Sequence, residues 1–190
     1  GWLIGAENTG MAAMFTMMNN ARLKVGIQGV GLAEQATQLA MSYAADRVQG
    51  RAPDAERGDN TPVPISTHPD VRNMLMTMRA LTDAARAICY ENGVFHDLAH
   101  FGGDERAKAF NELLTPISKA FSTDIANEVS SLGVQIHGGM GFVEETGIAQ
   151  FARDAKILPI YEGTNGIQAI DLINRKLPLA NGAILSEYLT

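Results

Sequence analysis

The spacing of apolar residues in three long stretches is the feature that most constrains how this chain can fold. In residues 7–47, 67–100 and 104–135, methionine, leucine, isoleucine, valine and phenylalanine recur every three or four positions, which places them on one face of a helix. The sequence shows no alternating strand pattern and no internal repeat. We therefore predict an all-α fold: an antiparallel four-helix bundle that runs up-down-up-down, with short extra helices near the C-terminus.

The composition agrees with a single helical domain. A chain of 190 residues with a hydrophobic fraction of 46% can fill one core, and its abundant alanine and methionine lose little rotamer freedom in a helix. The net charge of -6 argues against a nucleic-acid partner, because phosphates require a basic surface. The single cysteine, Cys89, falls on an apolar helix face and is interpreted as a buried thiol. No segment resembles a signal peptide or a membrane span, so we expect a cytoplasmic protein.

The first residues suggest a fragment of a longer protein. The sequence begins without methionine, and Trp2, Leu3 and Ile4 resemble the end of a strand that runs into the first helix.

Prolines, glycines and capping residues predict where the helices begin and end. Residues 50–67, rich in proline, glycine and charge, predict a long surface loop. Pro69 suits the first position of the second helix, with Thr67 or His68 as its cap, and Asp104 can cap the third helix. Thr115-Pro116 predicts a kink in the third helix, or a restart with the threonine as cap. The remaining segments predict two short helices within 144–156 and a last helix at about 164–177.

Three glycines, Gly26, Gly29 and Gly31, lie in the middle of the first helix. A glycine inside a helix costs up to about 1 kcal/mol relative to alanine. Such a cluster indicates close approach of a neighbouring helix or of a ligand.

One glutamate stands in an unusual setting. Glu162 follows the apolar run 157–161 and precedes a turn of small residues, Gly163 to Gly166. An apolar setting disfavours the charged form of a carboxyl group, which suits a base that must accept a proton. The bare backbone and the helix start at Thr164 and Asn165 could hold an anionic cofactor. The alternative is a helix N-terminus whose glutamate simply favours the helix dipole.

Other polar positions carry weaker signals. The segment VQIHGGMGF has a permissive backbone of the kind found against flat rings or phosphates, and a glycine-rich helix end explains it equally well. His137 in this segment is interpreted as a packing or capping residue. Arg22 lies among small and apolar residues and is expected to face an anionic group. Arg47, at the end of the first helix, either binds phosphate or complements the dipole. His96 and His100 have i, i+4 spacing but no clear third ligand, so we predict no metal site.

Taken together, several segments resemble one family over nearly the whole chain. GWLIGAENTGM, MMNNARLKVGIQGVGLAEQ, LTPISKAFSTDIANEVSSLGVQIHGGMGF and RDAKILPIYEGTNGIQ look like the C-terminal helical domain of acyl-CoA dehydrogenases. The loop after Arg51 and the variants NNARL and GTNGIQ look most like the branch that contains 3-(methylthio)propanoyl-CoA dehydrogenases.

The resemblance implies an FAD-dependent oxidoreductase that introduces an α,β double bond into an acyl-CoA thioester. By analogy, Glu162 is the base that removes the α-proton while the β-hydrogen leaves as hydride. Relatives that carry the base on the first helix have it at the position of Ala21, which cannot serve. We expect the Glu162 carboxyl group to be poorly hydrated and to lie near the middle of the first helix and near the QIHGG bend.

The resemblance also implies the other site residues. Asn19 and Arg22 correspond to the substrate region. Contacts with the flavin of a neighbouring subunit are implied for Arg47 and Gln49 and for the run Gln135, Ile136, His137, Gly138 and Gly139. A flavin contact is also implied for His68, although Pro69 departs from the glutamine often found there. The turn Gly163, Thr164 and Asn165 corresponds to the turn over the flavin.

Partners follow from the same analogy, and two alternatives stay open. The resemblance implies an acyl-CoA substrate, electron-transfer flavoprotein as acceptor, and a homodimer or homotetramer. It also implies an N-terminal helical domain and a middle β-domain that this chain lacks, so we expect residues 1–190 alone to be inactive. The alternatives are a non-catalytic helical module for oligomerisation or binding, and an acyl-CoA oxidase.

Overall fold

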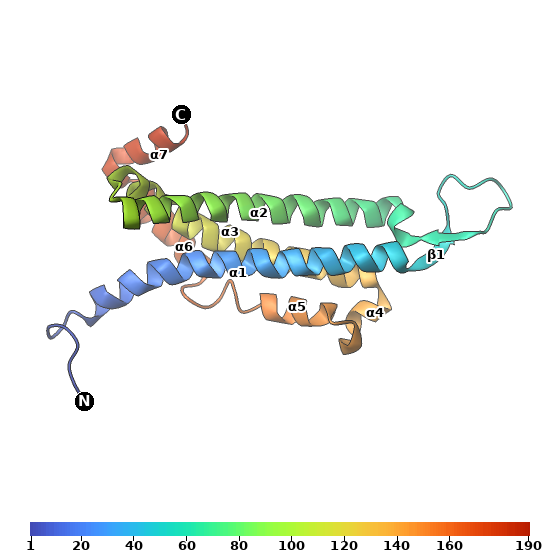
Figure 1. The fold of residues 1–190 in the computed structure, drawn as a ribbon, viewed down its shortest axis with the longest axis horizontal. Coiled ribbons are helices and arrows are strands. Elements are labelled where there is room, and N and C mark those ends of the chain that lie inside the picture. Colours follow the sequence, from blue (N-terminus) through green and yellow to red (C-terminus); the bar gives the residue numbers. More distant parts are fainter.

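Three long helices form the body of the protein. The computed structural model describes residues 1–190, apart from the side chain of Thr16. Helices α1 (Gly10–Asp46), α2 (Pro69–Gly102) and α3 (Glu105–His137) lie side by side and alternate in direction (Figure 1). The shorter helix α5 (Ile148–Ala155) packs against α1 and α3 in the fourth position. The predicted all-α antiparallel bundle is confirmed.

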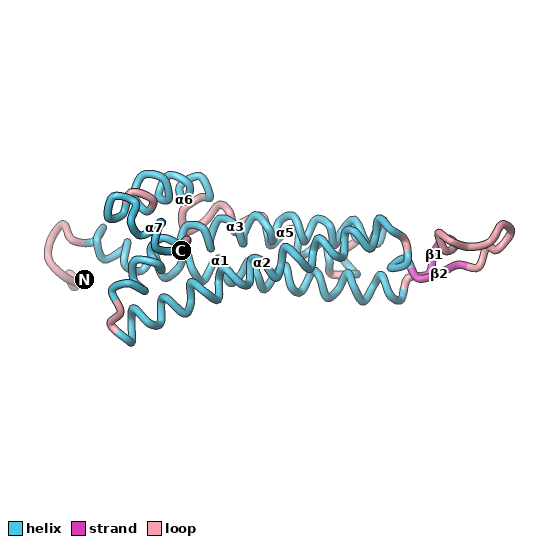
Figure 2. The backbone as a smooth tube through the Cα atoms, turned by 90° about the horizontal axis from the view of Figure 1, so that it is seen from above, coloured by secondary structure: helices cyan, strands magenta, loops and turns pink.

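Short elements gather at the two ends of this bundle (Figure 2). At one end lie an antiparallel pair of strands and three short helical turns: β1 (Val48–Arg51), β2 (Pro62–Pro64), η1 (Ile65–Thr67), α4 (Gly139–Phe142) and η2 (Glu144–Thr146). At the other end α6 (Asn165–Asp171) continues into the π-helical turn η3 (Leu172–Lys176), followed by η4 (Leu179–Gly182) and α7 (Ala183–Tyr188). The bundle therefore has two structurally different ends.

Small residues on α1 allow the helices to approach closely. Ala33, Ala36, Ala40 and Ala44 are fully buried in the main core. A Cβ atom added at Gly29 would lie 2.6 Å from the carbonyl oxygen of Ser122 on α3, and one added at Gly26 would lie 2.9 Å from that of Ser118. At Gly31 an added Cβ would meet no described atom within 4 Å. The predicted close approach is thus confirmed at Gly26 and Gly29, where the neighbour is a helix.

Helix α3 passes through Pro116 without a break. The hydroxyl of Thr115 donates to the carbonyl oxygen of Asn111 at 2.7 Å instead of capping a new helix. Leu113, Leu114 and Ser118 around the proline are buried, so packing against the neighbouring helices compensates for the lost hydrogen bond. The predicted restart at Thr115 is wrong.

Other local predictions also differ from the structure. The segment 50–67 contains the strands β1 and β2 at its edges, where we predicted only loop. Trp2, Leu3 and Ile4 are exposed and form no strand. The helices at the C-terminus, η4 and α7, were not predicted. The caps were predicted correctly at Asp104, whose carboxylate accepts the N–H groups of Arg106 and Ala107 at 2.9 and 3.0 Å.

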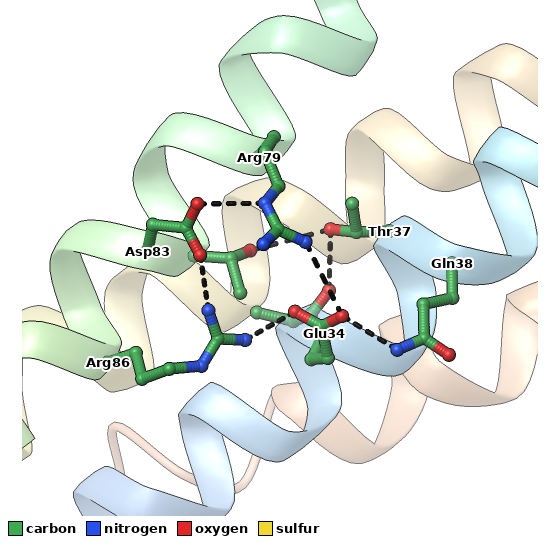
Figure 3. A network of polar contacts seen from close by, with 8 residues as sticks. Glu34, Thr37, Gln38, Arg79, Asp83 and Arg86 are labelled. Atoms are coloured by element: carbon green, nitrogen blue, oxygen red, sulfur yellow. Dashed lines mark hydrogen bonds and ion pairs between the residues drawn. The ribbon is translucent and has the colours of Figure 1, made fainter.

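A network of charged side chains joins α1 to α2 on the bundle surface (Figure 3). The Glu34 carboxylate on α1 pairs with Arg86 and, at 3.7 Å, with Arg79 of α2, and Asp83 pairs with both arginines. Gln38 donates to Glu34 at 2.7 Å. The hydrogen bond from Gln38 lowers the pKa of Glu34 most, burial opposes the shift, and Arg86 adds to it.

Two general features bear on function. No helix among the described residues is long and apolar enough to cross a membrane. Nor does the described part of the chain contain a group of three or more His, Cys, Asp or Glu residues that could hold a metal ion. His96 and His100 instead stack on each other, with ring centroids 5.9 Å apart. Cys89 is buried, as predicted, and burial raises the pKa of its thiol.

Candidate functional site

The site residues predicted from the sequence fall into two groups at the two ends of the bundle. Glu162 and the turn that follows it lie with Arg22 of α1, near α6, whereas Arg47 and the Gly138 bend lie near β1. Arg22 and Arg47 are 25 residues apart on α1 and its C-cap, or about 37 Å at 1.5 Å per residue. Glu162 was expected near the middle of the first helix and near the QIHGG bend; its turn lies beside Arg22, in the N-terminal half of α1, and the bend is remote from it.

Glu162 is held in a backbone conformation that side chains rarely adopt. Its φ is 54°, and Gly163 follows with a φ of 86°, so two consecutive residues are left-handed. For a residue with a Cβ this costs about 1 kcal/mol or more. The turn closes where the Asn165 N–H donates to the Pro159 carbonyl at 2.9 Å, and Thr164 caps α6 by accepting the N–H of Ile167 at 3.2 Å. The Glu162 side chain is partly exposed, so it is less buried than we expected.

The anionic partner of Arg22 is Asp171 at the end of α6. Nη1 of Arg22 donates to Oδ2 of Asp171 at 3.2 Å, and the two side chains are 7% and 8% exposed. A Cβ atom added at Gly163 would lie 3.4 Å from Nη2 of Arg22, so the guanidinium lies against the turn that carries Glu162. The prediction that Arg22 faces an anionic group is confirmed.

Two buried polar atoms in this region have no partner among the described side chains. They are Nε of Arg22 and Oε1 of Gln168. The amide nitrogen of Gln168 donates to the Gly163 carbonyl at 3.0 Å, and it would also be the atom nearest to a Cβ at Gly163, at 2.9 Å. Buried polar groups are rarely left unpaired in folded proteins. Nε of Arg22, 3.7 Å from where a Cβ at Gly163 would lie, and Oε1 of Gln168 are thus a buried donor and a buried acceptor without a partner in the described structure.

A buried lysine lies beneath the same turn. Lys119 of α3 is fully buried, and its Nζ donates to Oδ1 of Asn165 at 3.0 Å. The Asn165 amide in turn donates to the Ala120 carbonyl and to Asp124, at 3.2 and 2.8 Å. Burial lowers the pKa of Lys119 to about 8; the positive charge of Arg22 adds to this, while Asp124 and Glu162 oppose it. The Asn165 side chain is thus committed to α3.

The second group surrounds an open pocket of about 380 Å³ at the β1 end. Its lining contains Tyr43, Ile65 and Met140. It also contains most of the residues for which flavin contacts were implied at this end: Arg47, Gln49, Ile136, His137, Gly138 and Gly139. His68 is held beside this pocket, because its Nε2 donates to the Gln49 carbonyl at 2.7 Å. Gln135 is exposed and does not belong to the lining.

His137 is a packing residue, as predicted from its local sequence. It is buried, its ring stacks on that of Tyr43 with centroids 4.1 Å apart, and its Nδ1 donates to the Gly133 carbonyl at 2.7 Å. Burial lowers the pKa of His137, and the hydrogen bond to Gly133 opposes this shift.

Asn19 lies at the Glu162 end. It is exposed and lines a small cavity of about 20 Å³ together with Asp171 and Lys176. Asn19 and Arg22 are three positions apart on α1, so they are neighbours on one face of that helix.

Sequence reasoning missed three residues of this site: Lys119, Gln168 and Asp171. Lys119 carried a weak signal, because it stands one position before the apolar pair Ala120 and Phe121 in a segment with helical spacing. Gln168 and Asp171 are three positions apart on α6 and therefore share a face. Nothing in the sequence indicates that this face meets Arg22, 149 residues earlier.

Comparison with known proteins agrees with this geometry. Residues 8–177 match the family model of the acyl-CoA dehydrogenase C-terminal domain. The chain is 56% identical to a 3-methylmercaptopropionyl-CoA dehydrogenase of Ruegeria pomeroyi over 180 residues. This alignment covers 93% of this chain and 30% of the relative. It is 34% identical over 198 residues to a butyryl-CoA dehydrogenase of Syntrophomonas wolfei, with 100% of this chain and 32% of the relative covered.

A solved structure gives the same result. The structure of butyryl-CoA dehydrogenase from Megasphaera elsdenii superimposes with a TM-score of 0.74 at 29% identity, over 91% of this chain and 40% of that one. The chain spans about a third of the length of the curated relatives it matches. The sequence and the fold both show that this chain belongs to the acyl-CoA dehydrogenase family and matches the C-terminal domain of its members.

Proposed function

We propose that this chain is the C-terminal domain of an FAD-dependent acyl-CoA dehydrogenase that converts an acyl-CoA to the trans-2-enoyl-CoA. The observation that carries the proposal is the placement of the Glu162 carboxylate on a left-handed turn beside a buried guanidinium. Strained backbone of this kind persists where the surroundings over-determine it, and it concentrates at functional sites.

Glu162 is proposed as the base. Its carboxylate removes the α-proton of the thioester, and the electron pair of that C–H bond becomes the new α,β double bond. The β-hydrogen leaves with its own electron pair. Fixing the carboxylate by the turn at Gly163 reduces the rearrangement needed to reach the α-carbon. Asn19 and Arg22 would contact the substrate at the same end of the bundle.

The residues present fit a flavin dinucleotide in two places. At the β1 end, Gly138 and Gly139 present bare backbone, with no described atom within 4 Å of where a Cβ would lie, beside the exposed cation of Arg47. At the other end, Gly163, Thr164 and the backbone of Asn165 would lie against the isoalloxazine ring. When bound, FAD supplies the acceptor for the β-hydride.

The separation of these places supports an oligomer. Since about 37 Å of α1 separates them, we assign the pocket of Arg47, Gln49, His68 and the run 135–139 to the flavin of a neighbouring subunit. The full-length enzyme would then be a homodimer or homotetramer. Electron-transfer flavoprotein is proposed as the electron acceptor and the cytoplasm as the location.

We further propose that the flavin and the substrate need the N-terminal helical and middle β-domains of the full-length protein. The test compares the full-length enzyme with residues 1–190 alone, each supplied with FAD, short acyl-CoA thioesters including 3-methylthiopropanoyl-CoA, and an artificial electron acceptor. Turnover by the full-length enzyme only is the expected result. Turnover by residues 1–190 would refute the domain requirement, and peroxide formation without the acceptor would point to an oxidase. A full-length protein inert toward every thioester would refute the proposed function.

A further inference from the structure

The Arg22–Asp171 pair poses a question that base catalysis by Glu162 does not answer. The guanidinium of Arg22 lies within van der Waals distance of the space beside Gly163, the residue that follows Glu162. Yet in the part of the chain that the structure describes, Glu162 takes part in no ion pair, and the guanidinium pairs with Asp171. A buried cation and a nearby carboxylate attract each other strongly where water is scarce.

Asp171 has the position and the charge to prevent that pairing. Its side chain is 8% exposed, and its Oδ2 accepts from Nη1 of Arg22 at 3.2 Å. Its Oδ1 lies 3.6 Å from Nη1 of Arg175, a side chain that is 71% exposed and therefore a weaker competitor. Without the Asp171 carboxylate, the buried charge of Arg22 would lose its ion-pair partner while it lies against Gly163, the residue next to Glu162.

We propose that Asp171 is a positioning residue for the dehydrogenation: by binding Arg22 it holds the guanidinium against Gly163 and keeps it from pairing with Glu162, whose carboxylate stays able to accept a proton. This inference rests on the proposed function. A carboxylate that is paired with a guanidinium is a weaker base, because the pair stabilises its charged form.

Other charged groups face this cluster and must be considered in any pH profile. Arg175 pairs with Asp171 itself, and none of these groups forms an ion pair with Arg22 within the described structure. They are Lys119 and Asp124 of α3, Arg175 of η3, the Tyr161 hydroxyl beside Glu162, and the Lys176–Glu112 pair at 3.3 Å.

The test uses the full-length enzyme with FAD and compares wild type, D171N, D171E and E112Q. Glu112 is the matched control, because it forms an ion pair at the same small cavity without touching Arg22. We expect D171N to move the acid limb of the kcat profile to lower pH by about one to three units, as an opposite charge does for a carboxylate. If the logarithm of kcat falls by half a unit for each unit by which the pKa of the base falls, kcat above the acid limb decreases by roughly three- to thirtyfold. D171E and E112Q should keep the limb at the wild-type pH.

A crystal structure of D171N supplies a readout that does not depend on activity. We expect the guanidinium of Arg22 within about 4 Å of the Glu162 carboxylate, the distance at which an ion pair forms. A D171N enzyme that melts earlier but keeps the wild-type acid limb would overturn the proposal. If D171N does not fold, D171E decides: a limb at the wild-type pH supports the proposal and a shift of a unit or more overturns it. A wild-type enzyme without dehydrogenase activity would refute the proposed function, and the D171N structure would still show whether Arg22 moves to Glu162.

Discussion

Replacing Gly29 by alanine tests the packing of α1 on α3. The added Cβ would lie 2.6 Å from the Ser122 carbonyl oxygen, about 0.8 Å short of ordinary contact at 3.4 Å. Backbone atoms of α3 cannot rotate away, so the two helices must separate, and overpacking of this kind costs about 1–3 kcal/mol. Alanine regains at most about 1 kcal/mol of helix propensity. If alanine regains the full propensity term, the net loss in the free energy of unfolding is about 0–2 kcal/mol, and it is larger where the gain is smaller.

The same substitution at Gly31 is the matched control. Gly31 lies two residues further along α1, and an added Cβ there would meet no described atom within 4 Å. Only the propensity term remains, so G31A should raise stability by up to about 1 kcal/mol. For a chain of this length 1 kcal/mol shifts Tm by about 2–4 °C, which thermal melting followed by circular dichroism resolves. Equal shifts of the same sign in G29A and G31A would refute the packing argument.

Two further predictions concern stability. Because the pKa of Glu34 is lowered in the folded protein, its contribution is present above its ordinary pKa of 4.5 and is lost as the pH falls through the folded value. The free energies of unfolding of wild type and E34Q, measured with urea, should therefore differ by about 0.5–1 kcal/mol at pH 7, and the difference should shrink as the pH falls below 4.5; a constant difference would contradict this. Asp104 caps α3 through two N–H groups, so D104A should cost about 1 kcal/mol in urea unfolding, and a change below about 0.3 kcal/mol would show that the cap is dispensable.

The long helices were predictable because their signals are local. Helical spacing fixed α1 and α2 to within a few residues, and Pro69 and Asp104 marked starts that depend on adjacent residues only. Pro116 misled the prediction, because burial of its neighbours, which is a tertiary effect, outweighs the missing hydrogen bond. The strands β1 and β2 were missed because neither segment alternates and their pairing spans the long loop between them.

The site was predictable only in part, for a similar reason. Glu162 and its glycine were visible as a carboxylate between an apolar run and a turn, and Arg22 as a cation in an apolar helix. The partner of Arg22 was not visible, since Asp171 reaches it only when α6 folds back onto α1. Lys119 carried only a weak signal, because its burial depends on Asn165 at the start of α6, 46 residues later in the chain. Contacts between distant segments, which the tertiary fold creates, carry the part of the site that the sequence concealed.

The role of Glu162 as the base is tested most directly by the rate of flavin bleaching when the full-length enzyme is mixed with an acyl-CoA, compared between wild type and E162Q. We expect E162Q to stay folded and yellow but to be bleached about 10²- to 10⁴-fold more slowly, which is the usual contribution of a general base. E145Q, the same change at an exposed glutamate in η2, should bleach at the wild-type rate. Bleaching of E162Q within a few-fold of wild type would contradict the assignment of Glu162 as the base.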